Sequence, residues 1–61
     1  MKPTKRHNNK KITIYNHFFN ETVTGVYRHI DNGTCFEMVI NDEDGERVSL
    51  FSRSDFIVIY K

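Results

Sequence analysis

The chain has one cysteine, one proline, three glycines and no tryptophan in 61 residues. A single cysteine excludes an intramolecular disulfide, and no apolar stretch is long enough for a signal peptide or a membrane span. We therefore expect a cytoplasmic protein without membrane attachment. Cys35 lies inside an apolar run, so we interpret it as a small buried or half-buried side chain rather than a reactive thiol.

The sequence also lacks patterns that build catalytic or metal sites. It has no phosphate-binding glycine loop, and its three histidines have no second ligand at zinc-site spacing, so we expect them at the surface or in loops: His7, His17 and His29. A cluster of carboxylates lacks the spacing of a calcium loop and is interpreted as a solvated hairpin tip: Asp42, Glu43, Asp44 and Glu46. We expect no enzymatic activity, no metal, no cofactor and no small-molecule substrate, because a barrel this small fills its interior with side chains.

Short apolar runs separated by turn residues dominate the remaining sequence. The β-branched and aromatic composition of these runs predicts strands. The predicted fold is a small, all-β, five-stranded and strongly bent antiparallel barrel of the SH3-like or Sm-like type. The five runs are Ile12 to Tyr15, Thr22 to Ile30, Thr34 to Ile40, Val48 to Phe51 and Phe56 to Tyr60.

Turn residues and alternation give this barrel its details. Gly25 predicts a bulge or sharp bend within the second run, and a short polar break before the last run predicts one 3₁₀-like turn at residues 52–55. Tight turns are predicted at Asn32-Gly33 and at Asp44-Gly45. Alternation places one set of side chains inward and continues on the return strand: Ile12, Ile14, Phe36, Met38 and Ile40, then Val48 and Leu50.

Charge divides the chain into two parts. Residues 1–11 carry five basic residues and no acidic one, whereas residues 12–61 carry four basic and eight acidic residues. We expect residues 1–11 to form a flexible basic N-terminal arm and residues 12–61 to form the barrel domain. The arm is either a solubilising terminus or an attachment to nucleic acid through four cations, Lys5, Arg6, Lys10 and Lys11.

Aromatic residues near the first predicted turn suggest a binding surface. Adjacent phenylalanines in a strand or loop point in opposite directions, so one of the pair is expected in the core and the other at the surface, or both are packed. The favoured hypothesis is a non-enzymatic interaction module that binds a protein partner or self-associates. Its expected contact residues are Tyr15, Phe18, Phe19 and Tyr27. The alternative is a nucleic-acid-binding accessory protein that uses the basic arm.

Part of the pattern resembles a known family. The stretches Ile12-x-Ile14-Tyr15, Gly25-Val26-x-x-x-Ile30-Asp31 and Val48-x-Leu50-Phe51-x-x-x-Asp55-Phe56-x-x-Ile59 resemble the YolD-like proteins, small bacterial and phage-borne domains of SH3-like or Sm-like barrel type. The resemblance covers about fifty residues and consists mainly of hydrophobic spacing around a glycine and two aspartates, a pattern common to small barrels. It implies an accessory role, alongside DNA repair or damage tolerance. No RNA-contacting loop of the Sm and Hfq group is evident, so uridine-type RNA binding is not expected.

Overall fold

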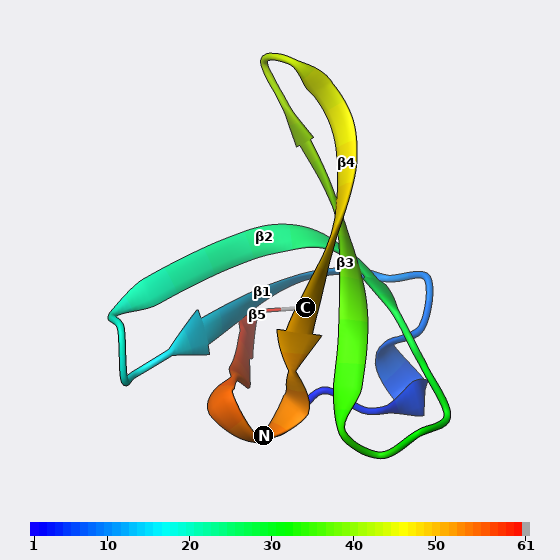
Figure 1. The fold of residues 1–61 in the computed structure, drawn as a ribbon, viewed down its shortest axis with the longest axis vertical. Helices are drawn as coiled ribbons and strands as arrows, with labels where there is room; N and C mark the ends of the chain where they lie inside the picture. The colour runs from blue at the N-terminus through cyan, green and yellow to red at the C-terminus, as the bar shows by residue number, and fades with distance from the viewer. Residues whose placement is uncertain (61) are drawn as a thin grey trace.

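Five antiparallel strands form one sheet, as the sequence predicts. The computed structural model describes residues 1–60; Lys61 and the side chain of Tyr60, at the end of the last expected strand, lie outside the described residues. The elements follow in the order η1 (Lys5–His7), β1 (Lys11–Asn16), β2 (Glu21–Arg28), β3 (Cys35–Asp42), β4 (Gly45–Ser52), η2 (Arg53–Asp55) and β5 (Ile57–Tyr60) (Figure 1). The short 3₁₀ turn η2 confirms the prediction for the polar break before the last strand.

The strand order in the sheet is β4-β3-β2-β1-β5, so β4 and β5 are its two edges. β2 connects the two halves of the sheet, because residues 21–26 pair with β1 whereas residues 26–28 pair with β3. Gly25 lies where these two pairings meet, and a Cβ atom there would lie 2.5 Å from the carbonyl oxygen of Val39. The register between β1 and β2 continues through this position without a shift, so β2 has no bulge there. The glycine is required by the close approach of the β2 and β3 backbones.

The core is small and aromatic. Its buried apolar side chains are Ile12, Ile14, Tyr27, Phe36, Met38 and Phe56. Of the residues expected to face inward along β1 and β3, four are buried, whereas Ile40 is only partly buried. The Phe36 ring lies 5.2 Å from that of Tyr27 and 5.9 Å from that of Phe51, between ring centroids. The rings of Phe51 and Phe56 meet edge to face at 5.0 Å, which joins the end of β4 to the start of the last strand. Such contacts stabilise aromatic pairs beyond the area they bury.

β4 departs from one sequence expectation. Val48 and Leu50 lie on one face of the strand, but both are exposed, and the face turned toward the core carries Phe51 instead. The cause is the register, which pairs Phe36 with Phe51. Directly opposed residues of an antiparallel pair share a face, so the buried Phe36 brings Phe51 inward and leaves the intervening residues outside.

Candidate interaction site

The β1–β2 hairpin ends in a four-residue loop that is held by its own side chains. Asn16, the last residue of β1, is buried, and its Oδ1 accepts a hydrogen bond of 2.9 Å from the amide of Phe18. The Tyr15 hydroxyl donates to Oδ1 of Asn20 at 3.0 Å, and Asn20 has a φ of 52°. Asparagine tolerates this left-handed conformation better than most residues. These contacts fix the path of the loop.

Two phenylalanines at this loop face solvent. Phe18 is 67% exposed and Phe19 is 77% exposed, and the His17 ring lies 4.2 Å from the Phe18 ring. The expectation that one of the pair lies in the core is wrong. Opposite orientation applies to consecutive residues of an extended strand, whereas both phenylalanines lie in the turn between β1 and β2, beyond the end of the core. We call Phe18 and Phe19 the aromatic tip.

The two tyrosines assigned to the same surface differ in position. Tyr15 is half-buried and supports the loop from the outer face of β1. Tyr27 was expected to contact a partner, and this is a further correction, because its side chain is completely buried. It lies on the core face of β2, where its ring packs on Phe36, and alternation alone does not tell which face of that strand is inward.

The Tyr27 hydroxyl takes part in a series of polar contacts on the core side of the sheet. It receives a hydrogen bond of 2.7 Å from the guanidinium of Arg53, and it lies 3.0 Å from Nδ1 of His29. Nε2 of His29 lies 2.9 Å from a carboxylate oxygen of Asp31. The two ring nitrogens of His29 thus connect the Tyr27 hydroxyl to the Asp31 carboxylate. The contacts hold the end of β2 and the following loop in place.

Arg53 connects parts of the chain that are far apart in sequence. Besides Tyr27, its guanidinium donates to the carbonyl oxygens of Pro3 and Cys35, the latter at 3.0 Å. Its central carbon lies 5.7 Å from the Phe36 ring centroid, within the range of cation–π attraction. No motif in the sequence identifies Arg53, because its partners are mostly backbone carbonyls.

The N-terminal segment packs on the sheet instead of extending from it. Pro3 and His7 are buried, and the carbonyl oxygen of Met1 accepts a hydrogen bond of 2.7 Å from the amide of Val58 in β5. Backbone bonds also join Asn9 and Lys10 to Tyr27. The boundary expected between an arm of residues 1–11 and the domain is therefore not a structural boundary, although the flexibility of the segment stays a prediction.

His7 is a second correction within this segment, since a surface or loop position was expected for it. Its ring is 4% exposed and meets the Tyr27 ring edge-on at 6.1 Å. Its Nδ1 accepts a hydrogen bond of 3.1 Å from the amide of Thr4, which closes the turn η1. The other two histidines agree with the expectation more closely: His17 is exposed and His29 is half-buried in a loop.

The basic residues near the N-terminus and the carboxylate cluster of the β3–β4 hairpin lie in different parts of the molecule. The four cations assigned to nucleic-acid binding are exposed on η1 and around the start of β1: Lys5, Arg6, Lys10 and Lys11. The carboxylate cluster of residues 42–46 lies at the tip of the β3–β4 hairpin, at the far end from η1 in Figure 1. There the Arg47 guanidinium, by its hydrogen bond, is the main cause that holds the pKa of Asp42 below its usual value.

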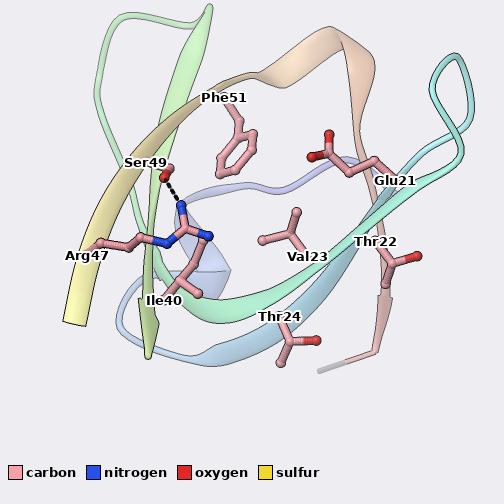
Figure 2. A pocket seen from close by; sticks show the side chains of 8 residues that line it. All are labelled: Glu21, Thr22, Val23, Thr24, Ile40, Arg47, Ser49 and Phe51. Carbon is pink, nitrogen blue, oxygen red and sulfur yellow. Dashed lines mark hydrogen bonds between the residues drawn. The ribbon is translucent and has the colours of Figure 1, made fainter. Parts of the chain in front are cut away.

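A groove of about 450 Å³ separates the first half of β2 from β4. Figure 2 shows Arg47 and Phe51 on one side of it and Val23 between the strands. Arg47 is already paired, through Nε to Asp42 at 2.9 Å and through Nη1 to Ser49 at 3.2 Å. The groove thus combines a partly apolar floor with a neutralised cation at its rim.

No family model, curated protein or solved structure matches this chain. The YolD-like resemblance therefore stays a prediction from the sequence pattern. Among residues 1–60, no group of three or more histidine, cysteine, aspartate or glutamate side chains is placed to hold a metal ion. None of the helical segments described is long and apolar enough to cross a membrane.

Proposed function

We propose that this protein is a non-enzymatic interaction module that inserts the aromatic tip, Phe18 and Phe19, into an apolar pocket of a protein partner. The observation that carries the proposal is the exposure of both phenylalanines on a loop whose path is fixed by Asn16 and Tyr15. Complete burial of one such side chain contributes about 1.5–3 kcal/mol, and aromatic anchors dominate many protein interfaces.

The fixed path of the loop supports the same proposal, because it lowers the entropic cost of binding. Ordering a flexible loop on binding opposes association by about 0.5–1.5 kcal/mol for each immobilised side chain. Here the backbone of the tip is already constrained by the two asparagine side chains, Asn16 and Asn20. A partner therefore gains the burial of two aromatic rings with little further ordering of the backbone.

The direct test places a photo-crosslinking phenylalanine analogue at position 19 and, as a control, at position 59, and identifies what is captured in cells. The captured protein is then purified and titrated against the wild type, a Phe18→Ser/Phe19→Ser variant and an Ile59→Ser control. We expect capture from position 19 and an affinity at least about tenfold weaker for the double variant only. Both substitutions replace exposed side chains, so the variant is expected to fold.

Three results would contradict the proposal. They are equal capture from both positions, unchanged affinity in the double variant, and loss of folding in each single variant, Phe18→Ser and Phe19→Ser. Folding is checked by circular dichroism before each titration. The Ile59→Ser control removes another exposed apolar side chain from a different part of the surface, so a general loss of hydrophobicity is distinguished from a loss at the tip.

The exposed cations on η1 and at the start of β1 support nucleic-acid binding as a second candidate function. Exposed charges are largely screened beyond a Debye length of about 8 Å at physiological salt, so an acidic hairpin tip at the other end of a molecule 29 Å long opposes phosphate binding at η1 only weakly. Deletion of residues 1–11 is a poor test, because it removes the buried Pro3 and His7. Charge reversal at Lys5 and Arg6, titrated with labelled single-stranded DNA and RNA, tests the candidate instead.

The expected result is binding that weakens steeply with salt, with a smaller salt slope for the Lys5→Glu/Arg6→Glu variant. Each phosphate neutralised contributes about −0.7 to the logarithmic slope on single strands. Binding with the same affinity and slope in both proteins would refute a role for these cations.

A further inference from the structure

The free edge of β4 has few of the features that protect most edge strands, and its only charged residues, Glu46 and Arg47, lie near its start. Its eight residues, Gly45–Ser52, remain in continuous register with β3, so no bulge twists the strand away. It contains no proline, and residues 48–52 carry no charge. An edge strand directs the N–H and C=O groups of alternate residues outward, where they can pair with another strand.

The outer face of β4 adds an apolar surface to this edge. Val48 is 56% exposed and Leu50 is 62% exposed, and both lie on the face opposite Phe51. Val39 of β3 is paired directly with Val48 and extends the same surface. At the other edge of the sheet, β5 is partly covered, because the carbonyl oxygen of Met1 accepts a hydrogen bond from the amide of Val58.

We propose that β4 pairs antiparallel with β4 of a second copy of this chain, across a two-fold axis that passes through Ser49 perpendicular to the sheet. Such an axis keeps the core faces of both copies on the same side and makes the interface isologous. Ser49 then lies opposite Ser49 of the second copy, and Val48 lies opposite Leu50 of the second copy. The sheet continues from one subunit into the other.

The sequence of β4 is complementary to itself in this register. The two Val48–Leu50 pairs form one apolar cluster on the outer face, and aromatic or aliphatic cross-strand pairs of this kind stabilise sheets. On the core face, Arg47 lies opposite Phe51 of the second copy, which favours a guanidinium–ring contact. Glu46 lies opposite Ser52 of the second copy, so no like charges oppose one another within the strand.

Neighbouring registers are less favourable. A shift of the axis to Val48 places the carboxylate of Glu46 against Leu50 of the second copy. A shift to Leu50 places Val48 against a serine. Only the axis at Ser49 gives both Val48 and Leu50 an apolar partner, and this self-complementarity is why a second copy, rather than an unrelated strand, is the occupant.

An engineered disulfide tests the register. In a Cys35→Ser background, Ser49→Cys places two thiols on opposed residues, whose Cα atoms lie about 4.5–5.5 Å apart, within the range of disulfides. The control, Ser52→Cys in the same background, places the thiols six residues apart along the paired strands, or roughly 20 Å. We expect mild oxidation to give a covalent dimer from Ser49→Cys, and much less from Ser52→Cys.

Sedimentation equilibrium of the unmodified chain provides the second measurement. We expect a monomer–dimer equilibrium that Leu50→Lys weakens at least about tenfold and that Phe18→Ser/Phe19→Ser leaves unchanged. Leu50→Lys should fold, because Leu50 is exposed and lies opposite Glu37 in its own sheet. A wild type that stays monomeric, a dimer insensitive to Leu50→Lys, or equal cross-linking from both cysteine positions would overturn the proposal. None of these outcomes bears on the aromatic tip.

Discussion

Replacement of Arg53 by methionine should destabilise this domain severely, because this half-buried side chain connects η2 to the N-terminal segment, β2 and β3. The guanidinium donates to the carbonyl oxygens of Pro3 and Cys35 and to the hydroxyl of Tyr27. A hydrogen bond from a charged donor contributes about 1.5–3 kcal/mol when buried. Because Arg53 is partly exposed, we take about 1 kcal/mol for each bond, and about 3 kcal/mol for the three.

That loss is large relative to the stability of so small a domain. At about 0.05–0.15 kcal/mol per residue, a chain of 61 residues has about 3–9 kcal/mol in total. Arg53→Met should therefore lower the free energy of unfolding by a third or more. Arg53→Lys should recover little of it, because one ammonium cannot replace a planar fork that spans three acceptors.

Urea denaturation followed by tyrosine fluorescence or circular dichroism measures this difference. The control is Arg28→Met, since Arg28 is exposed on β2, and a change within about 0.5 kcal/mol is expected there. Amide exchange adds a local test, because the Val58 amide bonds to Met1 and should lose protection when the contact between Arg53 and Pro3 is removed. Equal free energies for the Arg53 and Arg28 variants would refute the structural role of Arg53.

Two further predictions concern the sheet and its charged hairpin. Gly25→Ala should destabilise the domain by about 1–3 kcal/mol, because the new Cβ would meet the carbonyl oxygen of Val39 at 2.5 Å. The loss of stability is measured as the difference in urea midpoint from Thr24→Ala, a substitution at an exposed neighbour. Equal midpoints for the two variants would count against the clash. The pKa of Asp42 is lowered mainly by the Arg47 guanidinium and then by the Asp44 amide. The ionised Asp42 carboxylate therefore contributes its full stabilisation of the folded state above the ordinary pKa of 3.8, and this contribution disappears as the pH falls through the lowered pKa. Urea midpoints across acidic pH should thus fall more steeply for the wild type than for Asp42→Asn, and parallel curves would contradict this.

Alternation predicted β1 and β3 well because one face of each carries buried side chains. Ile12 and Ile14, and then Phe36 and Met38, are inward as their period of two requires. Alternation divides a strand into two faces without telling which is inward when both carry apolar residues. That ambiguity explains the errors at Tyr27 and along β4, where the register with β3, a long-range property, decides the burial.

The N-terminal segment was missed for a different reason. Its composition is polar and basic, and such segments rarely bury a core face. It packs nevertheless, because one arginine reaches back to Pro3 across 50 residues of sequence and because β5 bonds to Met1. The composition of the segment alone does not predict these long-range contacts.

The distribution of apolar side chains is the strongest argument that the protein surface takes part in binding. Among the residues that the structure describes, six large apolar side chains are exposed and six are buried, in a domain small enough that each additional buried side chain would raise its stability appreciably. Four of the six exposed residues form two pairs, Phe18 with Phe19 on a constrained loop and Val48 with Leu50 on an unprotected edge. Scattered exposure is ordinary on protein surfaces, whereas paired exposure at a rigid tip and along a free strand creates surfaces that partners can cover. Because the two pairs lie on different elements, substitutions at one should abolish its own association and leave the other intact.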